Sequence, residues 1–444
     1  MTDGRATRRR FLAGSSVAAV AGLAGCTDRL KSLRGGSVDD GSSGNESAEN
    51  GESDVAALTD GVPPLETEYN SRTEYGQPGD SLDDFEDLDA WEITRGSGET
   101  DQDVAFDGSQ SLHLTSENGQ TIVAQRDVSG TDLTDNDYSF AVRTTTPQDI
   151  TVNLRVVDSY GSDRIYSLRE ITYRTPDIGW FRASPGVFEE SDIAPTLDNA
   201  DRLEIRVLHS MDEAEIWIDD LRTHRKPETG YVMLTWDDGT RDFYDTAAPL
   251  HDEFGFTAVQ AVVPRWVVEG RNGIMSVSEL QDRQKEGDQI VVHGTHTSLH
   301  EYDDDAELEN RIRSDKNWFI ENEFEGADYI VYPNNSYDKT SLEYLTDYHY
   351  CGGFNQSGNV NTTTVYGFDP MALPRTIGHD LSTSKRCVDL AEAHNQCTIL
   401  NFHEFDANNT MPEGDYETFL EYVDNADVEV ITFDDLWKLR TDPF

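Results

Sequence analysis

Two adjacent aspartates and a cluster of histidines give this sequence its clearest chemical potential. Asp237 and Asp238 directly follow an apolar run, and His293, His296 and His300 lie within eight positions of one another. One carboxylate and two imidazoles form an open zinc site that leaves coordination positions for water and substrate. A second carboxylate, pointing to the other side of the chain, can carry a proton. These residue types therefore predict a metal site with a proton carrier beside it.

Each of these features also has a purely structural interpretation. Asp and Gly are common in turns, so Asp237-Asp238-Gly239 alone is equally typical of a strand-to-turn junction. His403, at the end of another apolar run, is by itself typical of a buried core histidine. The functional interpretation is favoured because the aspartates, the histidine cluster and His403 each follow an apolar run.

The elements that must position these residues are predicted from residue 229 onward. Near-continuous apolar runs are typical of parallel strands buried on both faces. Here they alternate with amphipathic stretches such as 304–323, which indicates a barrel or an open sheet. In barrels the chemistry lies where strands end and the following loops begin. The predicted strands are 231–236, 257–264, 289–294, 328–333 and 397–403.

Residues 79–226 have a different pattern, in which short alternating strands are separated by Gly, Asp and Asn turns. This pattern predicts a β-sandwich. The predicted strands include 111–116, 138–144, 150–158, 202–209 and 214–221. FDGSQSLHL and EIWIDDL resemble strands of jelly-roll modules found beside secreted glycan-active enzymes, which often bind sugar or carry a structural Ca²⁺. The sandwich is a candidate for both, with Trp91, Trp180 and Trp217 as a sugar-stacking platform or as core residues.

The charge balance is strongly acidic, with 86 Asp and Glu against 35 Lys and Arg and a formal net charge of −51. The acid is spread over predicted strands instead of forming one tail. This is typical of a protein from an extreme halophile, because molar salt screens carboxylate repulsion within roughly 3 Å. The composition argues against nucleic acid as a partner.

Residues 1–26 are predicted to be a twin-arginine lipoprotein signal. The arginine triplet 8–10 precedes an apolar run that is too short to span a bilayer, and the run ends in LAGC, which resembles a lipobox whose cysteine, Cys26, is lipidated. Residues 27–78 are rich in Gly, Ser, Asp and Glu and predict a disordered linker. We expect a protein exported by the twin-arginine route and anchored to the outer face of the cell membrane as a lipoprotein, with no other membrane contact.

The region 227–444 resembles the polysaccharide deacetylases with NodB homology, carbohydrate esterase family four. LTWDDG is similar to the motif TFDDG, HTSLH to H-[ST]-x-x-H, VYP to the Tyr-Pro motif, and ILNFH to the strand that ends in the catalytic histidine. EVITFDDLWKL is similar to the closing strand and helix. The resemblance covers about 229–440 and implies a distorted (β/α) barrel of about seven strands. The predicted protein is multidomain, with a jelly-roll-like sandwich ahead of a catalytic barrel.

The resemblance also implies roles for single residues. Asp238 and two histidines would hold a divalent metal, in most members Zn²⁺. Asp237 would be the general base and His403 the general acid. The backbone near Tyr332 and Pro333 would stabilise the oxyanion.

One departure from the family pattern concerns the base. Many members place an arginine before the Tyr-Pro motif, where it tunes the base, but residues 328–331 read Asp-Tyr-Ile-Val. Arg375, in ALPRTIGHD, is a candidate substitute.

The metal-ligating histidine pair has two readings. HTSLH reproduces the motif without a gap and pairs His296 with His300, which project to one side if the loop makes a helical turn. Counted from Gly287, the family's usual distance lands on His293, and one deletion then pairs His293 with His296. We expect the first pair, with His293 as the alternative ligand.

The function implied is a metal-dependent hydrolase that removes acetyl groups from N-acetylated glycans at the cell surface, with an acetylated polysaccharide or glycan as its partner. One alternative is a non-catalytic surface glycan-binding or envelope protein, which the missing arginine favours. Another is a hydrolase that uses the same site on ester acetyls or non-peptide amides. The presence of Asp237, Asp238 and His403 favours catalysis.

Overall fold

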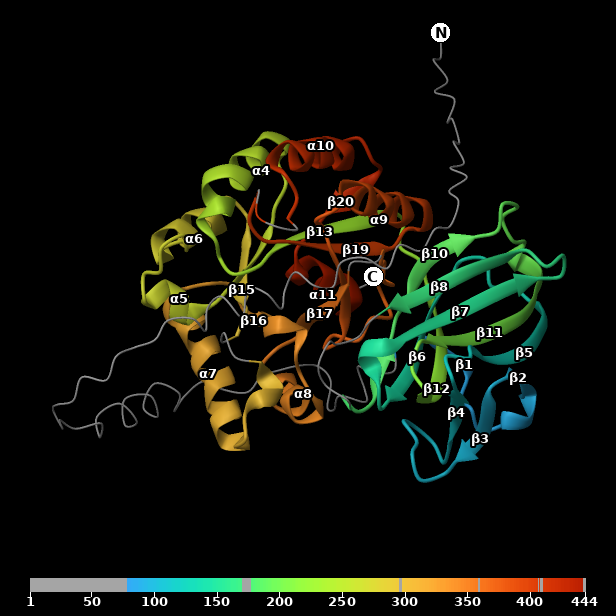
Figure 1. Ribbon diagram of the computed structural model, residues 1–444. Helices are drawn as coiled ribbons and strands as arrows, with labels where there is room; N and C mark the ends of the chain where they lie inside the picture. The colour runs from blue at the N-terminus through green and yellow to red at the C-terminus, as the bar shows by residue number, and fades with distance from the viewer. Residues whose placement is uncertain are drawn as a thin grey trace, which may run out of the picture. The chain divides into compact units, whose positions relative to one another are not determined.

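The computed structural model describes residues 78–169, 177–294, 298–357, 360–405, 407 and 410–441 of the 444-residue chain. The predicted signal, Cys26 and all but the last residue of the predicted linker lie outside the described residues. All described residues belong to one compact unit, Ala48–Phe444 (Figure 1). No helix among them combines the length and apolar composition needed to cross a bilayer.

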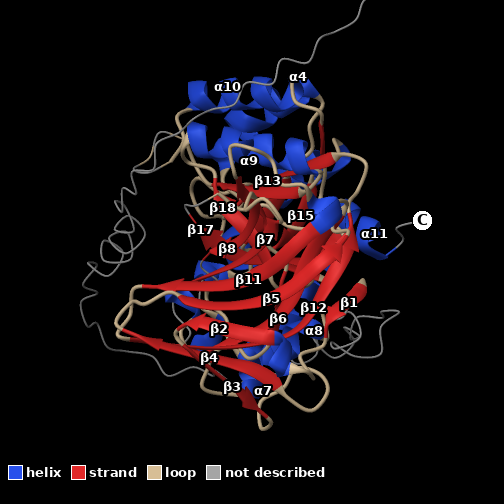
Figure 2. Ribbon diagram, turned by 90° about the vertical axis from the view of Figure 1, so that its right-hand side faces the viewer, coloured by secondary structure: helices blue, strands red, loops and turns tan. Residues whose placement is uncertain are grey.

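The first twelve strands form two antiparallel sheets, which confirms the predicted sandwich (Figure 2). The first sheet contains β1 (Asp80–Asp83), β3 (Ser97–Asp101), β4 (Ser111–Glu117), β6 (Asn136–Thr144), β9 (Phe181–Ala183) and β12 (Glu213–Arg225). The second contains β2 (Trp91–Arg95), β5 (Ile122–Thr131), β7 (Ile150–Asp158), β8 (Asp163–Arg169), β10 (Gly186–Glu190) and β11 (Ala200–His209). Their orders are β3-β4-β12-β6-β9, with β1 beside β12, and β10-β8-β7-β11-β5-β2. Short 3₁₀ turns are η1 (Leu88–Ala90), η2 (Pro147–Asp149) and η3 (Leu197–Asn199).

Alternating side chains build the core between these two sheets. In β7, Val152 and Leu154 are buried whereas the intervening Asn153 is partly exposed, as a strand with one covered face requires. Tyr138 of one sheet and Tyr166 of the other meet edge to face, with ring centroids 4.9 Å apart.

Two of the three tryptophans proposed as a sugar platform are buried, Trp91 at 6% and Trp217 at 7% exposure. Each indole N–H donates to a carboxylate, Trp91 to Asp83 at 2.7 Å and Trp217 to Asp101 at 2.9 Å. Trp91 belongs to the core between the sheets. Trp217 lies between two core residues of β12 and therefore faces the other side of its sheet, where it stacks on His113.

The remaining strands form one parallel sheet that curls into a barrel. They are β13 (Gly230–Trp236), β14 (Val259–Val262), β15 (Gln289–Val292), β16 (Gly326–Val331), β17 (Cys351–Ser357), β18 (Leu373–Ile377), β19 (Cys397–Phe402) and β20 (Val428–Val430). The order is β14-β15-β16-β17-β18-β19-β13-β20, and β13 also pairs with β14. The ring from β13 to β19 therefore closes at β13, which confirms the predicted barrel of about seven strands. All residues of β13 are buried, as expected for a strand covered on both faces.

Helices connect these strands and cover the outside of the barrel (Figure 1). They are η4 (Phe243–Ala247), α4 (Ala248–Phe254), α5 (Pro264–Val268), α6 (Val277–Lys285), η5 (Leu299–Glu301), α7 (Asp305–Glu321), η6 (Pro333–Asn335), α8 (Lys339–Thr346), α9 (Leu381–His394), α10 (Glu413–Asp424) and α11 (Phe433–Thr441). The helix predicted over 304–323 is α7, and its N-cap Asp304 accepts a hydrogen bond from the Glu307 N–H at 3.0 Å. Such a cap satisfies one of the free N–H groups of the first turn.

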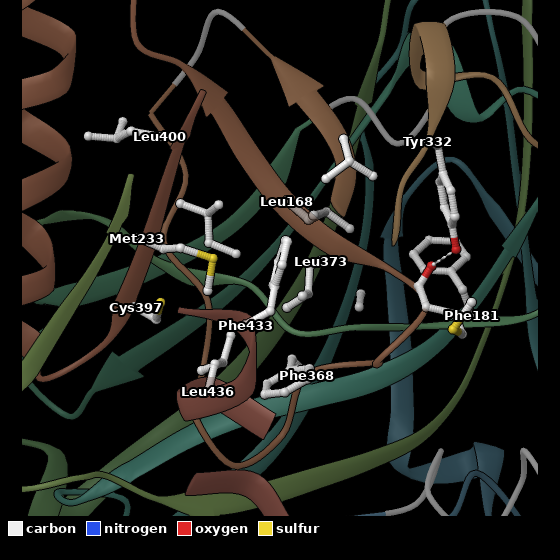
Figure 3. Close-up of a cluster of buried hydrophobic side chains, with 14 of the residues drawn as sticks. Leu168, Phe181, Met233, Tyr332, Phe368, Leu373, Cys397, Leu400, Phe433 and Leu436 are labelled. Carbon is white, nitrogen blue, oxygen red and sulfur yellow. Dashed lines mark hydrogen bonds between the residues drawn. The ribbon is translucent and has the colours of Figure 1, made fainter. Parts of the chain in front are cut away.

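Buried polar and apolar contacts join the sandwich to the barrel. The Val187 N–H donates to Gln396 Oε1 at 2.8 Å, and Gln396 Nε2 donates to Asp137 Oδ1 at 2.7 Å. Lys226 Nζ lies 2.9 Å from the same Asp137 oxygen. The cluster of buried side chains in Figure 3 likewise draws on both regions, with Leu168 and Phe181 from the sandwich and Met233, Cys397 and Phe433 from the barrel.

Candidate active site

Asp237 directly follows β13, and a buried arginine forms two hydrogen bonds with its carboxylate. The Asp237 N–H donates to the Phe402 carbonyl at 3.0 Å, which fixes the backbone against β19. Arg375 of β18 donates from one terminal nitrogen to Oδ1 and from the other to Oδ2, both at 3.0 Å. One of these nitrogens also lies 3.2 Å from Thr235 Oγ1. The arginine suggested by the sequence as a partner of the base therefore contacts that base.

The surroundings of Asp237 keep its carboxyl group ionised. Burial alone would raise the pKa of Asp237, but Arg375, followed by His293 and His403, holds that pKa well below its usual range. A carboxylate paired with a guanidinium in a buried place titrates in this way. The group is therefore free to accept a proton at neutral pH, although a low pKa makes it a weak base.

Asp238 differs from Asp237 in backbone conformation and in exposure. Asp238 adopts a left-handed conformation, φ 74°, which non-glycine residues seldom adopt. Its side chain is 32% exposed, against 3% for Asp237. Two neighbouring carboxylates thus have different surroundings, as a division between metal ligand and proton acceptor requires.

His293, which follows β15, faces both aspartates. Its Nε2 lies 3.7 Å from Asp238 Oδ1 and 4.0 Å from Asp237 Oδ2. Its Nδ1 lies 2.9 Å from the Val331 carbonyl oxygen. When Nδ1 carries the proton and donates to that carbonyl, the Nε2 lone pair is directed to the aspartates, which is the usual arrangement of a metal-ligating histidine.

The other two histidines of the loop are placed differently. His296 lies outside the described residues. His300, in η5, forms a hydrogen bond between its Nδ1 and Ser336 Oγ, and no contact within 4 Å joins it to either aspartate in the described part of the chain. The geometry thus favours the alternative ligand His293, and a role for His300 as ligand stays a prediction.

The start of the histidine loop lies close to the Tyr-Pro segment. Gly294 adopts φ 62°, and a Cβ built on it would lie 3.4 Å from Pro333 Cδ. The Tyr332 side chain is buried, and its hydroxyl donates to the Met371 carbonyl at 3.1 Å (Figure 3). The hydroxyl of Tyr332 is therefore engaged inside the barrel.

His403, immediately after β19, also lies close to Asp237. Its Nε2 lies 3.9 Å from Asp237 Oδ2. Its ring meets the ring of His379 edge to face, with centroids 5.6 Å apart. The loop that follows β18 therefore supplies a neighbour to the predicted acid, and sequence reasoning did not single out His379.

Asn401 is a second residue that sequence reasoning missed. Its side chain is fully buried two positions before His403, and neither its Nδ2 nor its Oδ1 has a hydrogen-bond partner among the described residues. The available signal was a lone polar residue within the apolar run 397–403.

One of the predicted metal ligands, His296, lies outside the described residues. Among the described residues, no group of three His, Cys, Asp or Glu side chains is arranged to hold a metal ion, in the barrel or in the sandwich. The predicted metal site and the predicted structural Ca²⁺ therefore stay predictions.

Residues 224–352 match the family model described as Polysaccharide deacetylase. The matched stretch covers less than half of the chain. It contains Asp237, Asp238 and the histidine loop, and it ends before Arg375 and His403. No curated protein is significantly similar in sequence to this chain.

Several solved structures resemble parts of the chain. Streptococcus pyogenes deacetylase PplD in complex with acetate is 18% identical, with a TM-score of 0.29, over 33% of this chain and 63% of PplD, less than two thirds of its length. The Xyl-CE4 domain of a xylanase from the hindgut metagenome of Trinervitermes trinervoides is 13% identical, with a TM-score of 0.36, over 48% of this chain and 91% of that domain. The family 11 carbohydrate-binding module from Clostridium thermocellum, in complex with a mixed-linked tetrasaccharide, is 15% identical, with a TM-score of 0.25, over 33% and 94%. These similarities are too weak to support an inference about activity.

The family match and the site described above lie in the same part of the molecule. The match begins just before β13 and spans the strands that carry both aspartates and His293. Residues 224–352 thus match the polysaccharide deacetylase family, and they lie in a barrel with the distorted (β/α) fold that the sequence predicted.

Proposed function

We propose that the protein removes acetyl groups from N-acetylated glycans in a reaction that depends on a divalent metal. The observation that carries this proposal is the bidentate contact of Arg375 with Asp237, close to both His293 and His403. It supports a base held ionised and oriented, with a candidate metal ligand and a candidate acid each within 4.0 Å of it.

The ligand set that we propose is Asp238, His293 and His296. One carboxylate oxygen and two imidazole nitrogens suit Zn²⁺ and leave room for water and substrate. The Val331 carbonyl supports this assignment by orienting His293 through its other ring nitrogen. A bound divalent ion would supply Lewis-acid polarisation of the acetyl carbonyl and of the attacking water.

The remaining steps belong to side chains and backbone of this chain. Asp237 accepts the proton of the attacking water, while Arg375 fixes the direction of its oxygens. The Tyr332 N–H donates to the oxygen of the acetyl carbonyl as negative charge develops there. His403 donates a proton to the leaving amine, so that acetate and a free amino sugar are released.

The alternative of a non-catalytic glycan-binding protein loses the observation that favoured it. The family arginine missing from residues 328–331 has a counterpart in Arg375, which reaches the same base from another strand.

For the N-terminal part, we propose export by the twin-arginine route and anchoring through Cys26 at the outer face of the cell membrane.

The test of the proposed function is release of acetate from N-acetylated chito-oligosaccharides in molar salt. We expect release by the metal-replete protein, loss after chelation, and recovery when Zn²⁺ is restored. An Asp237→Asn variant serves as the control for contaminating activity. Metal binding without acetate release from any N-acetylated glycan would contradict the proposal and leave ester acetyls and other amides as substrates.

A further inference from the structure

A row of five residues crosses the outer face of the second sandwich sheet. Strand register pairs Arg95 with Val123, Val123 with Arg206, Arg206 with Asn153, and Asn153 with Ser167. The row therefore crosses β2, β5, β11, β7 and β8, which lie one after another in Figure 2. We call these five residues the cross-strand row.

The cross-strand row faces away from the sandwich core. Along β11 the residues on either side of Arg206, Ile205 and Val207, are buried in the core, and along β7 the same holds for Val152 and Leu154. Successive side chains of a strand point to opposite faces. The residues between them therefore belong to the outer face.

Three neighbours in the row carry polar atoms that lack partners. Arg206 Nε, Asn153 Oδ1 and Ser167 Oγ are each shielded from solvent and have no hydrogen-bond partner among the described residues. Ser167 is only 2% exposed. Buried polar atoms in folded proteins are nearly always hydrogen-bonded. Three such atoms on adjacent strands point to a ligand that supplies the missing partners.

The arginines of the row differ from those beside it. In the next row, Arg155 pairs with Asp163 and with Glu204 at 2.9 Å, and Arg202 also pairs with Glu204 at 2.9 Å. Within the described residues, no carboxylate lies within 4 Å of the guanidinium nitrogens of Arg206 or Arg95. Asp163 lies within electrostatic range of Arg206 but forms its ion pair with Arg155. In the described part of a chain with 86 acidic residues, guanidinium groups that form no ion pair within 4 Å can bind an external anion.

We propose that the cross-strand row binds an acidic glycan, a polysaccharide whose sugars carry carboxylates, with its chain running across the strands. Arg95 and Arg206 are two strands apart, about 10 Å, which suits carboxylates on alternate sugars. Asn153, which is partly exposed and follows Arg206 in the row, binds a sugar hydroxyl beyond the two arginines. This inference rests on the proposed function and narrows its substrate to N-acetylated glycans that also contain uronic acid.

The experiment measures binding of the whole protein, in molar salt, to oligosaccharides of hyaluronan, which alternate glucuronate with N-acetylglucosamine. The matched ligand is the same oligosaccharide after reduction of its carboxylates to alcohols. We expect binding of the acidic form, and about tenfold weaker binding by Arg206→Gln or Arg95→Gln, as loss of a charge-assisted hydrogen bond predicts. Arg143→Gln is the matched control, because Arg143 lies on the other sheet and pairs with Asp177; it should bind like the wild type.

Equal binding of the acidic and the reduced ligand would overturn the proposal, as would unchanged binding by both variants of the row or no binding at all. Acetate release from a small soluble chito-oligosaccharide distinguishes a failure of the binding proposal from a failure of the proposed function. Arg206→Gln should release acetate from it at the wild-type rate, since the row lies outside the barrel. Absence of acetate release by the wild type would refute the proposed function but leave the binding measurement readable.

Discussion

The two terminal nitrogens of Arg375 each lie 3.0 Å from a different carboxylate oxygen of Asp237, although the residues are 138 positions apart. Both side chains are buried. A bidentate contact of this kind fixes the orientation of the carboxylate and stabilises its ionised form. A lysine, as a point charge, would not fix the orientation. The relationship makes Arg375 a positioning residue for the proposed base.

Replacement of Arg375 by Met should raise the pKa of Asp237, because burial then acts without its largest opposing charge. Activity should fall, and its loss on the acid side of the pH profile should move to higher pH. Leaving a buried carboxylate unpaired also lowers stability, by about 3–5 kcal/mol. Arg283→Met is the control, since Arg283 is equally buried and pairs with Asp288 outside the site. An acid limb that stays in place in Arg375→Met, or moves equally in Arg283→Met, would show that Arg375 does not act through the base.

Metal analysis of single alanine variants tests which two histidines of the loop bind the metal. His293→Ala and His296→Ala should both lose the ion, because a site with one ligand fewer binds far more weakly. His300→Ala should retain it, because His300 bonds to Ser336. Metal loss in His300→Ala with retention in His293→Ala would restore the pairing of His296 with His300.

The two aspartates should separate metal binding from turnover. Asp237→Asn should keep the metal and reduce the rate of acetate release by roughly 10²–10⁴, as expected for loss of a general base. Asp238→Asn should lose both metal and activity. Metal content and kcat measured on the same preparations test this division, and equal metal loss in both variants would contradict it.

Buried neutral histidines should make the fold sensitive to mild acid. Burial, followed by a neighbouring arginine, lowers the pKa of His224 and of His251 to about 3, and burial lowers the pKa of His349 well below its usual range. In the unfolded chain each has a pKa of about 6.5. The unfolded state therefore binds more protons than the folded state below pH 6.5. The contribution of each histidine to the free energy of unfolding is therefore fully present above about pH 6.5. It falls by about 1.4 kcal/mol per pH unit as the pH decreases below that value.

Burial raises the pKa of Asp315 to about 7 and that of Asp219 to about 6, so these two groups stabilise the folded state as pH falls and oppose the histidines. The difference in Tm between the wild type and His224→Gln, measured from about pH 6.5 to 5, isolates the contribution of one histidine. His224→Gln should lose less Tm with falling pH than the wild type. An equal pH dependence of Tm in both proteins would contradict the prediction.

The membrane anchor is tested at Cys26, which lies outside the described residues. Cys26→Ser should release the protein into the medium or leave an unprocessed precursor, because the thiol is the proposed site of lipidation. Fractionation and electrophoretic mobility measure both. A variant found in the membrane fraction with wild-type mobility would contradict the anchor.

The sequence by itself determined the order of elements and the identity of most site residues. Period-two strands before residue 226 and apolar runs alternating with helices after it reflect which faces are buried, and burial patterns are local in sequence. Asp237, Asp238 and His403 were found because they directly follow such runs, where a barrel collects its loops.

The tertiary structure decided which of these side chains meet. Asp238 follows β13 and His293 follows β15, and both strands pair with β14. The Val331 carbonyl of β16 contacts the His293 imidazole and orients it toward Asp238. Arg375 reaches Asp237 because β19 pairs with both β18 and β13, so that the strands carrying the two residues are only two positions apart in the sheet. Register and closure depend on packing between segments more than a hundred positions apart, and residue spacing within one motif carries no information about that packing.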